Sequence, residues 1–298
     1  MKEALASKPF ADIERKDVRE IRDNVLENAG PIQSNRVVAL FNRVMNWAVD
    51  QGEAKFNPAA RLTKVGQEQR RERLLTPDEL NRVWPELDTP IAVDHEAGGL
   101  TDADLRAAMS VRRALKLLAL TGQRRGEVIG MAKCELDLTE GDAWWTIPKG
   151  RTKNGLPHRV PLTAMAVEVL REAIEAAGDS EFIFPSTKTD GPIRPDAVTK
   201  QLQRICRRMK PKIVGVGPHD IRRTIGTTLR KLGVSVEDRS CVFNHVSGAK
   251  SKVTSWNYDA GEHDEEKRTA LEKWERELRR IVGLEPARVI DIRRAKGS

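Results

Sequence analysis

The chain has 298 residues, of which 39% are hydrophobic and 32% charged, a composition typical of folded globular proteins rather than disordered ones. Its 52 basic and 44 acidic side chains give a formal net charge of +8, which favours a polyanionic partner, most often nucleic acid. Three widely separated cysteines argue against a disulfide framework and a zinc site, and no apolar run approaches a membrane span, so we expect a cytoplasmic protein.

The first part of the chain predicts two helices. Apolar residues recur on one side of residues 10–29, Pro31 marks a break, and a stronger apolar stripe follows over residues 34–50. We interpret this stripe as core packing between helices. Its members are Val37, Leu40, Phe41, Val44, Trp47 and Ala48. Together these elements predict a small helical domain over residues 1–62.

Residues 63–75 differ in character, because basic side chains crowd into a polar stretch without helix or strand periodicity. We interpret this stretch as a linker between the small domain and a larger one. It could lie along a phosphate backbone, or its charges could simply be solvated. Its candidates for a phosphate contact are Arg70, Arg71 and Arg73.

Two helix starts follow the linker, each with a threonine as the expected N-cap. Thr76 stands three residues before Glu79, the spacing of a capping box. Thr101 begins a long, strongly apolar pattern that ends at Gly122. We expect this second helix to be the central core helix of a domain over residues 76–283.

The periodicity then changes from helix to strand. Residues 134–138, 143–147 and 158–162 have strand composition, and Asn154-Gly155 is a strong hairpin-turn signal between the last two. Three basic residues line the approach to that turn: Lys149, Arg151 and Lys153. The predicted fold class is therefore mainly α with a small antiparallel β-sheet (α+β), the sheet having a basic hairpin tip.

Helical patterns resume after the sheet and continue almost to the end of the chain. They cover about 163–177, a segment from Pro195 that carries Lys200 and Arg204, 218–232, 236–243 and 262–282. Residues 288–292 alternate like a lone strand.

The helix expected from Pro218 carries a pair of groups suited to an anion. His219 and Arg222 are three residues apart, so they share one face near the helix N-terminus. An imidazole and a guanidinium at the positive end of a helix suit a phosphate. Such pairs also arise by chance in many helices, where they are solvated, so the spacing alone does not identify a site.

Five separated motifs, in a consistent order over residues 12–282, make the chain resemble the tyrosine recombinases, or phage integrase family, and in particular the integrases of prophages and genomic islands. They are the stretch Thr121 to Glu127, the stretch Arg151 to Gly155, His219-Asp220-Ile221-Arg222, Asn244-His245, and a tyrosine followed by the last helix. The positions that match the family's catalytic residues are Arg124, Lys153, His219, Arg222, His245 and Tyr258.

The resemblance implies a role for each matched position. Arg124 and Arg222 would hold the non-bridging oxygens of a DNA phosphate, and His245 would donate a further hydrogen bond. Lys153 would protonate the leaving 5′-oxygen, with Lys149 and Arg151 as rivals for this role. Tyr258, the only tyrosine of the chain, would attack the phosphorus with help from His219. Glu127 would support the basic groups.

The resemblance also implies an architecture and partners. Residues 1–62 would be a core-binding domain, incomplete at its N-terminal side compared with the family's usual form, and residues 76–283 the catalytic domain. Residues 284–298 would dock on a neighbouring protomer and link a homo-tetramer on paired double-stranded DNA core sites, in the nucleoid, with accessory DNA-bending proteins as further candidate partners. No cofactor and no metal are implied. The candidate DNA contacts are Arg70, Arg71, Arg73, Arg125, Arg151, Lys200, Arg204 and Arg223.

Two other functions share much of this pattern. A type IB topoisomerase-like nicking-closing enzyme would use the same chemistry without strand exchange. A catalytically silent DNA-binding regulator would keep the basic surface, but it would have no need of Tyr258. The resemblance favours a site-specific recombinase that integrates or excises a mobile element through a covalent 3′-phosphotyrosine.

Overall fold

The computed structural model describes residues 8–66, 72–88, 101–245 and 263–284. The chain divides into two compact units, residues 1–72 and 73–298. The predicted fold class is confirmed, since the described residues form helices and one three-stranded antiparallel sheet. The finer boundaries of the linker at 63–75 stay a prediction. Four features predicted from the sequence lie outside the described residues: Arg70, Arg71, Tyr258 and the tail 285–298 with its strand-like segment.

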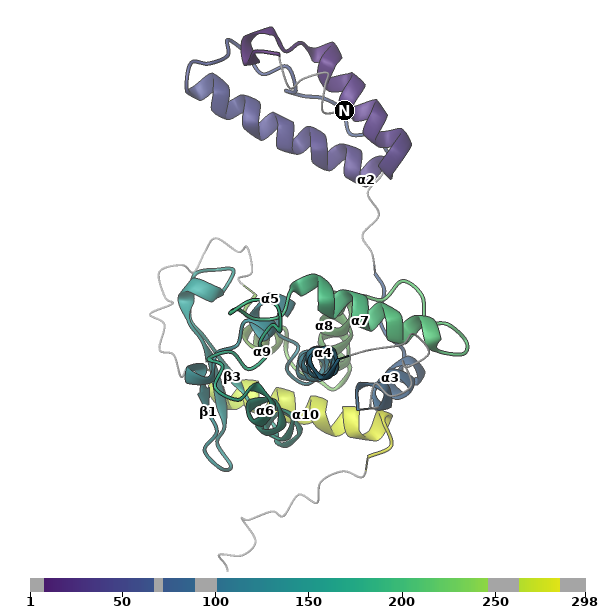
Figure 1. Ribbon diagram of the computed structural model, residues 1–298, viewed down its shortest axis with the longest axis vertical. Coiled ribbons are helices and arrows are strands. Elements are labelled where there is room, and N and C mark those ends of the chain that lie inside the picture. The colour runs from purple at the N-terminus through teal and green to yellow at the C-terminus, as the bar shows by residue number, and fades with distance from the viewer. Residues whose placement is uncertain (1–7, 67–71, 89–100, 246–262, 285–298) are drawn as a thin grey trace, which may run out of the picture. The chain divides into compact units, whose positions relative to one another are not determined.

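The first unit is built from one helical segment, α2 (Arg15–Asp50), which follows a short 3-10 turn, η1 (Phe10–Asp12). Gly30 interrupts α2 with φ +79° and ψ 175°, a conformation that favours glycine, and Pro31 follows it. Figure 1 shows the resulting two arms of α2 side by side. Ser34 Oγ ties them together by donating to the Arg22 carbonyl at 2.7 Å. The predicted break between two helices is therefore present.

The interpretation of the apolar stripe in residues 34–50 as core is wrong for half of its members. Leu40, Val44 and Trp47 are 59%, 39% and 55% exposed. The second arm of α2 packs through its other residues, and the core cluster of the unit consists of Ile13, Val18, Met45, Ala48, Ala54 and Ala59. One helix arm and a short return segment cover only one face of this arm. Within the described residues, the rest of its stripe faces solvent.

The second unit is organised around α4 (Asp102–Thr121), as predicted. Figure 1 shows α4 near the centre of the unit, with α6 (Ala164–Ala177), α7 (Pro195–Arg208), α8 (Pro218–Lys231) and α10 (Asp264–Ile281) around it. Residues 114–121 of α4 are buried almost without interruption except at Lys116, which is the pattern of a helix covered on most sides.

Glycine ends α4 where the chain must turn sharply toward the next element. Gly122 has φ +65° and caps the helix through its N–H to the Leu118 carbonyl. A Cβ atom at Gly122 would lie 2.7 Å from the ring of Phe243, so a larger residue does not fit. The sequence after Gly122 is thereby brought against the segment that follows α9 (Val236–Val242).

The sheet is small and antiparallel, in the order β1-β2-β3. It consists of β1 (Leu136–Asp137), β2 (Trp144–Ile147) and β3 (His158–Pro161), with Trp144 opposite Pro161 and Ile147 opposite His158. A 3-10 turn, η4 (Lys133–Glu135), occupies the start of the first predicted strand. Residues 148–157 connect β2 and β3 and include a further 3-10 turn, η5 (Lys149–Arg151), so Asn154-Gly155 lies within a broader tip than a two-residue hairpin.

Short elements complete the unit: α3 (Pro77–Val83), η2 (Pro85–Leu87), α5 (Arg125–Ile129) and α9 (Val236–Val242). The capping box predicted at Thr76 and Glu79 is present, with Thr76 Oγ1 accepting from the Glu79 N–H at 3.1 Å. None of the helices in the described ranges is both long and apolar enough to cross a membrane.

Candidate active site

Four of the six predicted catalytic residues converge in the second unit. Arg124 lies between α4 and α5, His219 and Arg222 lie in the first turns of α8, and His245 follows α9. Arg222 contacts His245 directly, and the charges of Arg124 and Arg222 act on the ring of His245. Three helix junctions that are distant in the sequence therefore meet at one cluster of two guanidinium groups and two imidazoles.

Arg222 is the most deeply placed member of the cluster, with only 5% of its surface exposed. Its Nη1 donates to the Gly122 carbonyl at 2.8 Å, and its Nη2 donates to the Phe243 carbonyl and to His245 Nε2, the latter at 3.0 Å. The guanidinium carbon also lies 4.7 Å from the centre of the Phe243 ring. Burial and the nearby Arg124 lower the pKa of Arg222 to about 10, so it is still charged at pH 7.

Arg124 is held by a buried carboxylate. Its Nη1 donates to Glu127 Oε1 at 2.8 Å, and its backbone N–H donates to Glu127 Oε2 at 3.0 Å. Its Nη2 donates to the Asn244 carbonyl at 3.2 Å. Glu127 is 3% exposed, and its supporting role in catalysis stays a prediction. One carboxylate against two guanidinium groups leaves the cluster positively charged, which suits an anion.

The two histidines of the cluster are neutral at pH 7. Partial burial, followed by the charges of Arg222 and Arg124, lowers the pKa of His245 to about 4. The same causes, burial first and then Arg222, lower the pKa of His219. A guanidinium only donates, so His245 Nε2 accepts from Arg222 and the ring proton is on Nδ1.

Three consecutive carbonyls before His245 are each bound by a side chain from another element. The Val242 carbonyl accepts from Gln123 Nε2 at 2.8 Å and from His158 Nε2 at 3.2 Å. Arg222 binds the next carbonyl and Arg124 the one after it. The segment that carries His245 is thus fixed by the same arginines that form the cluster.

No motif surrounds His158 in the sequence, so we expected it to be a surface residue; this is wrong, because it is 3% exposed. Burial, followed by the charge of Lys267, lowers its pKa to about 3, so the buried ring is neutral. Alternation along residues 158–162 places His158 on the same buried face as Val160, and this pattern was the signal for its position. Gln123, which is also buried, had no comparable signal.

The tip between β2 and β3 carries the predicted lysine. Lys153 is exposed, and the next residue, Asn154, bonds through Nδ2 to Asn244 Oδ1 at 2.5 Å. The tip therefore lies beside the segment that leads to His245. Of the two rivals to Lys153, Lys149 is exposed, whereas Arg151 pairs with the buried carboxylate of Glu135.

Besides Arg151, two of the predicted DNA contacts have acidic partners within the unit. Arg73 pairs with Glu79 and also bonds to the Leu74 carbonyl. Lys200 pairs with Asp196 at 3.3 Å while staying largely exposed.

The remaining described candidates lie on α5, α7 and α8. Arg125 bonds to the hydroxyl of Thr199, Arg204 is exposed on α7, and Arg223 is half-buried on α8. Together with Lys200, these residues give α7 and its neighbours a basic character, and their contacts with DNA stay a prediction.

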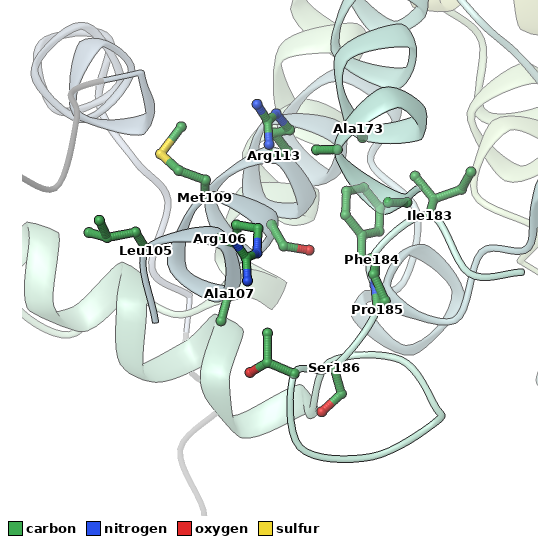
Figure 2. Close-up of a pocket in the computed structure, with 14 residues that line it drawn as sticks. Leu105, Arg106, Ala107, Met109, Arg113, Ala173, Ile183, Phe184, Pro185 and Ser186 are labelled. Atoms are coloured by element: carbon green, nitrogen blue, oxygen red, sulfur yellow. The ribbon is translucent and has the colours of Figure 1, made fainter. Parts of the chain in front are cut away.

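We also looked for a metal site and for a pocket among the described residues, as alternatives to this cluster. No three His, Cys, Asp or Glu side chains among them lie close enough to hold a metal ion. A separate hollow of about 450 Å³ lies between α4 and residues 183–187; Figure 2 shows Arg106, Arg113 and Phe184 among the side chains that line it. It contains no member of the cluster.

Comparison with known proteins places the chain among integrases. Residues 92–253 match the model of the phage integrase family. Prophage integrase IntZ of Escherichia coli (strain K12) is 26% identical over 229 residues, which is 77% of this chain and 52% of that protein. The chain thus spans about half the length of this curated relative.

Solved structures share the fold at lower identity. A lambda integrase(75-356) dimer bound to a COC' core site is 20% identical, with a TM-score of 0.56, over 80% of this chain and 81% of that one. The XerH site-specific recombinase, in a pre-cleavage complex with its difH substrate, is 16% identical, with a TM-score of 0.57, over 83% and 68% of the two chains. At these identities the likeness establishes the fold.

Proposed function

Because the chain belongs to the phage integrase family, we propose that it is a site-specific DNA recombinase that cuts and rejoins DNA strands through a covalent 3′-phosphotyrosine, integrating or excising a mobile element. The observation that carries this proposal is the meeting of Arg124, Arg222, His219 and His245 at one positively charged cluster. Double-stranded DNA and further copies of the chain, in a tetramer on paired core sites, are its proposed partners.

The arginines supply the binding of a phosphodiester. Planar guanidinium groups suit two-point contacts with phosphate oxygens. Each arginine also donates to a backbone carbonyl, which fixes the plane of its guanidinium group. His245 has its proton on Nδ1 and donates that N–H to a phosphate oxygen.

The cleavage step is an in-line displacement at phosphorus. The Tyr258 hydroxyl oxygen forms a bond to phosphorus, and its proton passes to the neutral imidazole of His219. The bond between phosphorus and the 5′-oxygen breaks, and Lys153 gives that oxygen a proton. The products are a 3′-phosphotyrosine and a free 5′-hydroxyl. Attack by a 5′-hydroxyl of the partner strand reverses these transfers, so the step needs no nucleotide cofactor.

The test is covalent trapping on a nicked DNA substrate. Cleavage near the nick releases a short fragment that carries the 5′-hydroxyl, and the protein stays attached to the 3′-phosphate. We expect an adduct with the wild-type chain and none with Tyr258→Phe, since Tyr258 is the only tyrosine. An adduct that still forms with Tyr258→Phe would refute the assignment of Tyr258 as the nucleophile.

The same preparation separates the alternative functions. Relaxation of supercoiled plasmids without any preferred sequence, together with an absence of strand exchange, would indicate a type IB topoisomerase-like enzyme. Tight DNA binding without an adduct on any substrate would indicate a regulator.

A further inference from the structure

Two asparagine side chains form a reciprocal amide pair at the edge of the cluster. Asn154 Nδ2 donates to Asn244 Oδ1 at 2.5 Å, and Asn244 Nδ2 donates to Asn154 Oδ1 at 3.3 Å. The two residues are 90 positions apart, and both are partly buried. The pair therefore ties the tip between β2 and β3 to the segment that leads from α9 to His245.

On the tip side, Asn154 is held in a defined conformation. Its Oδ1 also accepts from the Leu156 N–H at 3.3 Å, a local turn that asparagine forms readily. Arg151 fixes the other end of the tip by pairing with Glu135 and donating to the Glu127 carbonyl. Lys153 lies between these two attachment points.

On the cluster side, Asn244 occupies a backbone conformation that few residues adopt. Its φ is +48°, in the left-handed region, where asparagine is tolerated better than most side chains. Its carbonyl accepts from Arg124 Nη2 at 3.2 Å. A continuous chain of contacts thus runs from the guanidinium of Arg124, through Asn244, to Asn154, which is the residue beside Lys153.

The proposed reaction requires that the amine of Lys153 be placed accurately, and this chain of contacts can hold it. A lysine side chain is long and flexible, so the place of its amine depends on where the backbone beneath it is held. An acid that is misplaced by about 1 Å can cost ~100-fold in rate. Only an anchored tip keeps the amine in reach of an oxygen on the phosphate that Arg124 binds.

We propose that Asn154 and Asn244 are positioning residues that hold Lys153 at the leaving 5′-oxygen. This inference rests on the proposed function, since it takes Lys153 as the general acid. In this proposal, Asn154 and Asn244 act on neither the phosphate nor the attacking oxygen. The proposal assigns the side-chain pair an effect on the amine of Lys153, while the Asn244 carbonyl that accepts from Arg124 belongs to the backbone. Loss of the two side chains should therefore impair protonation of the leaving oxygen and spare the other steps of cleavage.

The test compares two DNA substrates in single-turnover cleavage. One is ordinary DNA, and the other has sulfur in place of the bridging 5′-oxygen at the cleaved phosphate. A thiolate leaves without a proton, because the pKa of a thiol is only about 8.5. Cleavage of the sulfur substrate therefore needs no general acid, but it still needs the nucleophile and the phosphate-binding arginines.

The variants are chosen to remove the amide pair and little else. Asn154→Ala removes one partner. Asn244→Gly removes the other and keeps the left-handed backbone without strain. We expect each variant, and the double variant, to slow cleavage of ordinary DNA by about 10- to 100-fold, with no further loss in the double. All three should cleave the sulfur substrate close to the wild-type rate, as Lys153→Ala should.

Arg124→Ala is the control variant, and its cleavage rate should stay low on the sulfur substrate. If Lys153→Ala is rescued and the asparagine variants are not, or if they cleave ordinary DNA normally, the positioning role is wrong while the proposed function stands. If Lys153→Ala itself is not rescued, the acid role of Lys153 fails, and the positioning role fails with it. Should Asn154→Ala not fold, Asn154→Asp keeps the size of the side chain and one of the two bonds, and we expect an intermediate loss with the same rescue.

Discussion

The Nη2 atom of Arg222 lies 3.0 Å from the Nε2 atom of His245. The guanidinium donates, so this contact exists only while the ring nitrogen is unprotonated. With the carbonyls of Gly122 and Phe243, His245 completes a set of three acceptors around one buried cation. The plane of Arg222 is therefore fixed before any phosphate arrives, which is the arrangement that electrostatic catalysis requires.

We first predict that Arg222→Lys abolishes most of the cleavage activity. A lysine offers a point charge instead of a planar fork, and it cannot satisfy acceptors on two sides while holding a phosphate. The expected loss is at least about 100-fold in the single-turnover rate. The matched control is Arg223→Lys on the next, half-buried position of α8, and it should stay within a few-fold of the wild type. Equal losses in the two variants would contradict a special place for Arg222.

Glu127→Gln is predicted to impair catalysis more than folding. Glu127 accepts from two N–H groups of Arg124, and glutamine offers only one oxygen and no charge. Charge-assisted hydrogen bonds of this kind contribute ~1.5–3 kcal/mol, so cleavage should fall by about 10- to 100-fold. The exposed Glu237→Gln on α9 should have no effect. A wild-type rate for Glu127→Gln would show that Arg124 needs no carboxylate.

The folded chain should become less stable as the pH is lowered, because of His158. Its pKa is about 3 in the folded chain and near 6.5 when unfolded, so between these values the unfolded chain binds more protons. The free energy of unfolding therefore decreases as the pH falls through this window, by up to about 1.4 kcal/mol for each pH unit from this one group. Lys267, Arg222 and Arg124 add repulsion to any charge on the ring.

The pH effect can be assigned with one substitution. His158→Gln keeps a donor for the Val242 carbonyl and does not titrate. Urea unfolding at a series of pH values from 4 to 8 should give a shallower pH dependence for this variant than for the wild type. Parallel curves for the two proteins would exclude His158 as the source.

Much of this fold was predictable because local signals agreed with the final structure. The threonine caps, the apolar run of α4 and the proline at the start of α8 each mark an element that is present. The exposed stripe on α2 was not predictable in this way. Periodicity shows that Leu40 and Trp47 share a face, but whether another element covers that face is a tertiary property.

The sequence indicated which residue types form the site, but it did not indicate the contacts that these residues make with distant segments. The spacing of His219 and Arg222 indicated a shared helix face, but no local pattern indicates that Arg222 reaches the carbonyl of Phe243. The same holds for Asn154 and Asn244, whose contact depends on how a hairpin tip and a helix end meet. Long-range side-chain to backbone bonds carry no sequence period, so only the fold reveals them.

Arg151 and Arg204 provide the last prediction, since the sequence suggested DNA contact for both and the structure separates them. Arg151 pairs with Glu135, a nearly buried carboxylate, and donates to the Glu127 carbonyl. Without Arg151, the carboxylate of Glu135 would lose its ion pair, and its other described partner is the indole N–H of Trp145. Arg151→Ala should therefore destabilise the fold by about 2 kcal/mol or more while leaving the salt dependence of DNA binding unchanged.

Arg204→Ala should behave in the opposite way, because Arg204 is exposed on α7. Its loss should alter stability by no more than ~0.5 kcal/mol and reduce the slope of log affinity against log salt by about 1. Both quantities can be measured on the same preparations, by urea unfolding and by DNA-binding titrations over a range of salt concentrations. If Arg151→Ala instead lowers the slope and spares the stability, its ion pair with Glu135 opens on DNA, and Arg151 belongs to the interface.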